Sequence, residues 1–478
     1  MMGFAPRIRA QEHSSDSLTH YIQVAIANNP GVKSQQFAYE AFLEKIPQAG
    51  AYPDPELSIE AYTMPMEIIG GRSFGTASIM QMFPWFGTRK AARTEAGHMA
   101  NMQDRQYRET VDDLILQVST QWYAMQQLKE QLRNNEENRK LLEQLEQLAI
   151  RKFSAPSGGT TPGSAPPARS EAAAAPVSAL SPSAMGGMSM GSNTRAASVA
   201  DPAMNMSSGP AMGGMSNGGQ SGMSEVLRIQ LELVAIENSI ESLHSQIKAE
   251  KARFNTLLNR ASGEEVQLGD EIHQVTFSAD ETAALSAIQI RNPMLGMITE
   301  EGLAYKAKAE MDRKMSYPMI GLGVAYMAVG KSSNTMFAMD GMNGRDMVMP
   351  MVTMSLPVFR KKYDAQQREG RLWWKSSEEN FRNTFNRLKG DYYGFKSQLD
   401  DAGRMIRLYE KQTALAHTTY QLIIKEFVTG RSDLTNVIQV QRQLLDYQLK
   451  KAEAITNYNT MVASIRKLTA TYEHILID

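Results

Sequence analysis

The chain has 478 residues, of which 42% are hydrophobic and 21% are charged, and its formal net charge is −1. This balanced charge lacks the basic excess that nucleic-acid binding requires, and the absence of cysteine excludes disulfides, thiolate metal sites and cysteine nucleophiles. No run of 18 apolar residues occurs, so the sequence predicts no transmembrane helix. Residues 1–16 are an N-terminal segment and a candidate remnant of a secretory signal, without the apolar stretch of such a signal.

The first half of the chain, residues 17–153, changes its periodicity twice. Two short helices are predicted over Ser17–Asn28 and Val32–Ala49, the second preceded by Asn-Pro. Alternating polar and apolar residues then predict a β-hairpin at about 55–84. An uninterrupted helical stripe predicts a long helix over 88–153.

An insert rich in methionine, glycine, serine and proline follows at residues 154–223. It holds eight prolines, twelve glycines and four charged residues, so it cannot bury a core and we predict that it is disordered. Thioether sulfur is a soft ligand that selects Cu(I) and similar ions, which makes its methionines candidate metal ligands. They are Met185, Met188, Met190, Met204, Met206, Met212, Met215 and Met223. Contact with a partner protein and compositional drift are the alternatives.

The rest of the chain repeats the order of the first half. A return helix is predicted over 224–260 and a linker over 261–280. The second repeat, 281–475, again has Asn-Pro between its short helices, a β-hairpin at about 318–357 and a long helical hairpin over 361–472. The turn of that helical hairpin consists of Gly430, Arg431, Ser432 and Asp433. This ordered recurrence indicates an internal duplication.

The four predicted strands are about 8 to 11 residues long, a length that crosses a bilayer when tilted. Four strands cannot close a barrel and lipid does not tolerate open edges, so other copies must complete it, and three copies give twelve strands. A soluble hairpin capping a coiled coil is the alternative. Strand parity predicts that one face carries a lumen-side track of methionines: Met319, Met327, Met347, Met349 and Met351. Such a track suits a soft cation that binds weakly at several sites as it passes. The alternative is that the methionines only fill packing gaps.

Several motifs together resemble the TolC-like outer membrane efflux protein family (outer membrane factors), over Ser17 to about Tyr472. They are Asn29-Pro30, Tyr52-Pro53-Asp54-Pro55, Gln81 to Gly87, the turn Gly430 to Asp433, and Gln439 to Leu444. The resemblance implies an α+β membrane fold. Long α-helical hairpins form a periplasmic tunnel, and four transmembrane β-strands per protomer complete a 12-stranded trimeric β-barrel in the bacterial outer membrane. Some members carry a lipidated cysteine, which this sequence lacks.

The resemblance also implies partners and an aperture. The partners are two further copies in a homotrimer, a periplasmic adaptor protein, an inner-membrane transporter of the RND type and outer-membrane lipid, with no nucleic acid. The turns between helices lie at the periplasmic tip, and the positions that line its constriction match Glu225, Arg228, Asn436 and Gln439. These residues predict a polar aperture in place of the acidic ring usual in the family. Ordinary solvent-facing residues of a coiled coil are the alternative.

The sequence therefore predicts a passive channel of the copper/silver efflux type. It has no catalytic arrangement of an enzyme and no cofactor of its own, and its cargo is Cu(I) or Ag(I), carried from the periplasm to the exterior. Two other functions stay open: a channel for drug efflux or type I secretion whose insert is an adaptor-docking tether, and a soluble coiled-coil scaffold.

Overall fold

The computed structural model describes residues 18–68, 70–154, 221–269, 271–278, 280–333, 341 and 343–472. The chain divides into two compact units, a larger one of Met1–Glu143 with Glu232–Asp478 and a smaller one of Gln144–Leu231. Strands of both predicted repeats pair in one sheet of the larger unit. Within the described residues, no helix combines the length and the apolar character needed to cross a bilayer.

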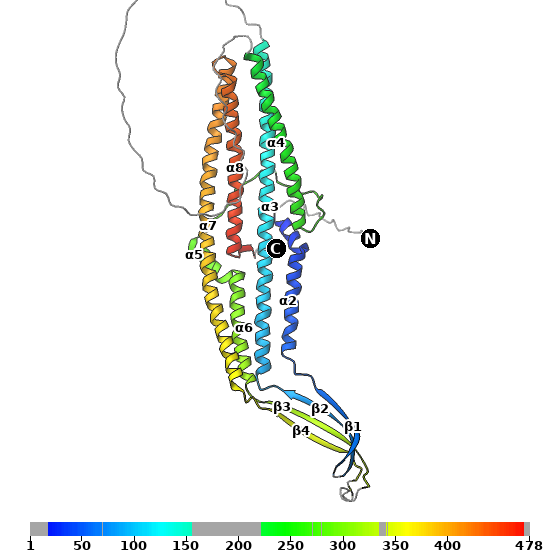
Figure 1. The fold of residues 1–478 in the computed structure, drawn as a ribbon. Coiled ribbons are helices and arrows are strands. Elements are labelled where there is room, and N and C mark those ends of the chain that lie inside the picture. Colours follow the sequence, from blue (N-terminus) through cyan, green and yellow to red (C-terminus); the bar gives the residue numbers. More distant parts are fainter. Residues whose placement is uncertain are drawn as a thin grey trace, which may run out of the picture. The chain divides into compact units, whose positions relative to one another are not determined.

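The two halves have the same order of elements: two short helices, two strands, a long helix and a return helix (Figure 1). The first half comprises α1 (Leu18–Asn28), α2 (Pro30–Ala49), β1 (Glu56–Ile68), β2 (Gly71–Phe83), α3 (Thr88–Ser154) and α4 (Ser221–Leu257). The second comprises α5 (Glu281–Arg291), α6 (Pro293–Met315), β3 (Met319–Gly330), β4 (Met347–Ser355), α7 (Arg360–Val428) and α8 (Leu434–Leu468). The strands β1 and β2 have 13 residues each and are longer than predicted. Their pairing continues past register shifts, between Ala61 and Met66 in β1 and between Ser73 and Gly75 in β2.

Equivalent asparagines begin α2 and α6 and tie them to the ends of the return helices. Each helix starts with proline at its first position, so α2 begins two residues before the predicted Val32. The Asn29 and Asn292 side-chain oxygens accept hydrogen bonds from backbone N–H groups in the first turn of their helices. Their amide nitrogens donate to the carbonyl of Leu257 at 3.1 Å and to that of Leu468 at 3.0 Å. The duplication thus extends to tertiary contacts.

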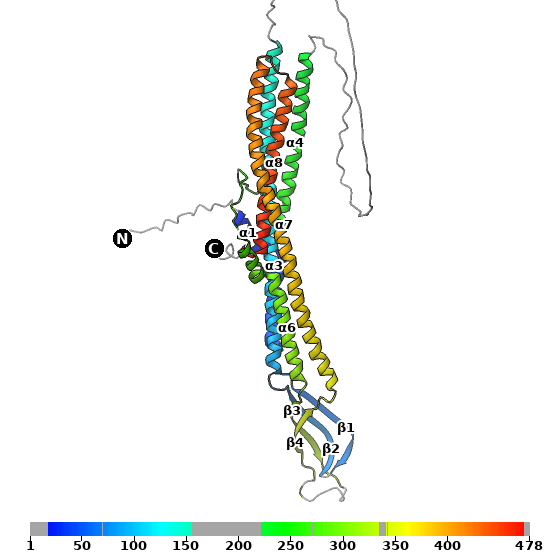
Figure 2. The ribbon, with the colours of Figure 1, turned by 90° about the vertical axis from the view of Figure 1, so that its left-hand side faces the viewer.

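The apolar core lies where the short helices pack against the long ones. In the first half, the Tyr21 ring lies 5.3 Å from both the Trp122 and the Phe254 rings. In the second half, buried residues of α5, α6, α7 and α8 surround Tyr392, which is fully buried. The long helices α7 and α8 run antiparallel, and the sheet lies at the opposite end of α7 from its turn to α8 (Figures 1 and 2). The sheet and the turns are therefore separate candidate functional regions.

Candidate functional site

The first candidate region is a single antiparallel sheet in the order β1-β2-β3-β4 (Figure 2). Its two halves meet in the pairing of β2 with β3, where Ile79 lies opposite Val324. The edge strands β1 and β4 each have one paired neighbour in the described part of the protomer. An edge strand presents a row of backbone groups that another strand can pair with, so the sheet is able to extend at both edges.

One face of the sheet is apolar and exposed. The register aligns Leu57, Ile79 and Val324 in one row across β1, β2 and β3, and their exposed fractions are 67%, 53% and 47%. The same face carries further exposed apolar side chains: Ile59, Leu322, Tyr326, Val348, Val352 and Met354. Contiguous exposed apolar surface marks contact with a membrane or with another protein.

The opposite face combines methionine with small and polar residues. Met351 lies in a row with Gly323, Met80 and Glu56, and Met347 lies in a row with Met327, Thr76 and Glu60. Met349 and Met319 have the same strand parity, so the register places all five methionines of the predicted track on this face.

Two further methionines, Met80 and Met82 of β2, share this face and were missed by the sequence reasoning. Met82 pairs with Gly321 and Met80 with Gly323, both on β3. Their alternation with Ile79 and Gln81 is the signal that could have found them.

Aromatic side chains gather where the sheet joins the helices. The rings of Tyr52 and Phe83 meet edge to face at 5.6 Å, and the rings of Trp85 and Tyr317 stack at 5.2 Å. The Arg89 guanidinium lies 3.4 Å from the centre of the Tyr52 ring. Tyrosine and tryptophan are enriched where apolar lipid meets water, so this junction has the composition of a membrane boundary.

The second candidate region is the turn between α7 and α8. Gly430 has φ +75°, a left-handed conformation in which L side chains are strained, so glycine suits this position. The predicted aperture residues Asn436 and Gln439 are exposed on the first turns of α8, in the larger unit.

The other two aperture residues lie on α4, in the smaller unit. Glu225 is half-buried and Arg228 is exposed. The same helix carries Met223, which is 71% exposed. The other seven methionines predicted as metal ligands, and residues 1–16, lie outside the described residues.

Polar contacts join α8 to both long helices of the first repeat. The buried Gln441 donates from its amide nitrogen to the Asn138 side-chain oxygen of α3 at 2.7 Å. The neighbouring Arg442 forms an ion pair with Glu232 of α4, with its Nε donating at 3.1 Å. Both residues belong to the motif Gln439 to Leu444, but the sequence did not identify their partners. These contacts hold the return helix of one repeat against the other repeat.

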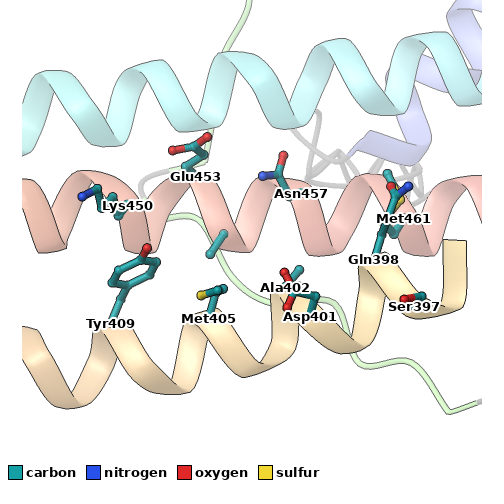
Figure 3. Close-up of a pocket in the computed structure, with 11 residues that line it drawn as sticks. Ser397, Gln398, Asp401, Ala402, Met405, Tyr409, Lys450, Glu453, Asn457 and Met461 are labelled. Atoms are coloured by element: carbon teal, nitrogen blue, oxygen red, sulfur yellow. The ribbon is translucent and has the colours of Figure 1, made fainter. Parts of the chain in front are cut away.

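Farther along the hairpin, α7 and α8 enclose a groove (Figure 3). Met405 and Tyr409 line it from α7, and Lys450, Glu453 and Met461 line it from α8. Lys450 is paired with Asp446 at 2.8 Å, so its charge is already balanced. Among the described residues, no group of three histidine, aspartate or glutamate side chains is arranged to hold a metal ion.

Comparisons with known proteins agree with this architecture. Residues 21–176 match the family model described as outer membrane efflux protein. Three solved structures share 11% or 12% sequence identity with the chain. They are the outer membrane protein VceC from Vibrio cholerae (11%, 95% of each chain covered, TM-score 0.64), CusC (12%, 95% of this chain and 91% of that one, TM-score 0.67), and the open MtrE outer membrane channel from Neisseria gonorrhoeae (12%, 93% and 88%, TM-score 0.61).

No curated protein sequence matches the chain. The structural likenesses confirm the predicted fold class of long helices with a small antiparallel sheet. The family match itself extends over residues 21–176, about a third of the chain.

Proposed function

We propose that this chain is a passive outer-membrane channel of a tripartite efflux pump that exports Cu(I) or Ag(I) from the periplasm to the exterior. The observation that carries the proposal is the two-faced sheet with pairable edges. Lipid permits only closed arrangements of strands, and three copies of a four-stranded sheet supply twelve. In that barrel, the apolar face contacts lipid and the face with methionine, glycine and glutamate lines the lumen.

A row of exposed leucines on α7 supports assembly from several copies. Leu408, Leu415 and Leu422 recur every seven residues and are 44%, 69% and 55% exposed. Apolar residues at this repeat form the seam between packed helices. We assign this row to contact with a neighbouring copy in a homotrimer. The helical hairpins extend into the periplasm, where an adaptor protein and an RND-type inner-membrane transporter, which supplies the energy, are the proposed partners.

The choice of cargo rests on methionine chemistry. Thioethers are neutral soft ligands that favour Cu(I) over hard cations, and the five methionines of the predicted track share one sheet face. The insert methionines, with Met223 at its end, are proposed to capture or relay the ion at the periplasmic mouth. The residues after the turns, Asn436 and Gln439 among them, are proposed to line the aperture there.

Metal accumulation in cells tests this function. Cells lacking the protein should accumulate copper and silver, and restoring the protein should reverse this. Bile salts and dyes serve as control substrates. Unchanged metal levels together with accumulation of dyes or bile salts would refute the metal cargo and favour a channel for organic substrates. Changing the eight insert methionines to serine should lower metal tolerance while the trimer still assembles.

A further inference from the structure

The strongest unassigned feature outside the predicted track is a pair of methionine sulfurs above Gly321. We propose that Met80 and Met82 form a binding site for a soft monovalent cation in transit, with Met351 as a third donor. This inference rests on the proposed function only for the orientation of the sheet, with the methionine face toward the lumen. The site would be one binding position on the path of the ion through the lumen.

The geometry brings both sulfurs to one place. A Cβ atom on Gly321 would lie 2.6 Å from the Met82 sulfur and 3.5 Å from the Met80 sulfur. Because both distances are measured from one point, the sulfurs are no farther apart than the sum of the two. Gly321 has no side chain, so both thioether groups can lie close to its backbone.

A second glycine, Gly323, lies between Met80 and the third donor, Met351. Met80 pairs with Gly323 of β3, and Gly323 pairs with Met351 of β4. Only a glycine therefore separates the two methionines within their row of the sheet. Glycine in a strand interior weakens the strand and often marks a place where a ligand approaches the backbone closely. Two glycines on one face of β3, both opposite methionines of β2, fit that role.

The ligand class follows from the donors. Thioethers carry no charge and select soft ions such as Cu(I). The methionine side chain has three rotatable bonds, so small rotations can direct two sulfurs at one ion. Neutral thioethers add no ionic attraction to the cation, and conduction needs sites that are favourable enough to enter and weak enough to leave. The site therefore suits a transported ion better than a structural one.

Silver titration of the full-length protein in detergent tests the site, because Ag⁺ is monovalent and needs no reductant. With ¹³C-labelled methionine methyl groups, the Met80 and Met82 resonances should shift together and follow one common saturating curve. Met80→Leu should weaken the response of Met82 at least tenfold. Met354→Leu, which changes a 54% exposed methionine on the opposite face, is the matched control and should leave that response unchanged.

A positioning variant keeps every methionine. Gly321→Ala adds a methyl group at the point 2.6 Å from the Met82 sulfur, so that sulfur must move. Silver affinity at Met80 and Met82 should then fall at least severalfold, while the sheet and the trimer persist. Unchanged affinity in this variant, or in Met80→Leu, would overturn the inference.

The result is separable from that of the proposed function. If the insert methionines respond to silver but Met80 and Met82 do not, the site is refuted while metal export still stands. If Met80 and Met82 saturate with silver but cells lacking the protein accumulate no metal, the site stands and the proposed cargo is refuted.

Discussion

Replacing Asn292 by alanine should loosen the junction between α6 and the end of α8. The side-chain oxygen accepts from the Met294 and Leu295 amides at 3.1 and 3.4 Å, and its nitrogen donates to the buried Leu468 carbonyl. Loss of the N-cap costs about 1 kcal/mol, and the carbonyl left without its donor costs about 1–3 kcal/mol. The total of about 3 kcal/mol corresponds to a roughly 100-fold change in the equilibrium constant for local opening, since each 1.4 kcal/mol is a factor of ten.

Hydrogen exchange followed by mass spectrometry measures this effect locally, without assuming two-state unfolding of an oligomer. Amides in the first turn of α6 should exchange roughly 100-fold faster in Asn292→Ala, by the same conversion. The duplication supplies a matched control. Asn29→Ala removes the equivalent contacts, but the bond to Leu257 is only part-buried, so its effect should be smaller. Asn292→Asp keeps the capping oxygen and replaces the donor nitrogen by a carboxylate oxygen, which cannot donate to the Leu468 carbonyl. Equal exchange in Asn292→Asp and the wild type would refute the role given to the Leu468 contact.

Three further predictions concern charge, protonation and the sheet faces. Lys467→Met should destabilise the contact of α8 with α3 by about 2 kcal/mol, because it leaves the mostly buried Glu109 without its partner at 3.0 Å, and thermal melting of the assembled protein measures this. Burial raises the pKa of Tyr420 from 10.0 to about 12, so over this range the folded state keeps a proton that the unfolded state loses. Stability should therefore fall as the pH rises through that range, and alkaline unfolding followed by circular dichroism should show a smaller fall in Tyr420→Phe. Val352 is 73% exposed on the apolar face. If that face contacts lipid, Val352→Arg should lower the stability of the barrel by up to about 2–4 kcal/mol. Thr353→Arg, on the other face, should lower it less. Equal trimer yields from membranes for these two variants would contradict the assignment of the faces.

The positions of the helices could be predicted because their signals are local. The stripe of α7 persists over 69 residues, so single polar interruptions do not hide it. Asn-Pro before α2 and α6 combines a capping side chain with a residue that fits the first helical position. The parity of β3 and β4 is equally local, since successive side chains point to opposite faces of a strand.

Contacts between distant segments could not be predicted, because one sequence gives the face of a strand but not its neighbour. The pairing of β2 with β3 joins residues more than 200 positions apart, and only that register brings Met80 opposite Gly323. Likewise, Gln441 reads as a polar residue on a helix. Its burial and its bond to Asn138 arise from the packing of α8 on α3.

The duplication also explains how the sheet can extend without a defect. Each repeat supplies one hairpin, and the order β1-β2-β3-β4 is antiparallel at every step. The edge strands β1 and β4 therefore run in opposite directions. If β4 of one copy pairs with β1 of the next, the new pair is antiparallel as well, and this head-to-tail contact can repeat until a ring closes. An odd number of strands per copy would force a parallel pair at each junction. Two hairpins per chain thus meet the even strand number of bacterial barrels in every copy.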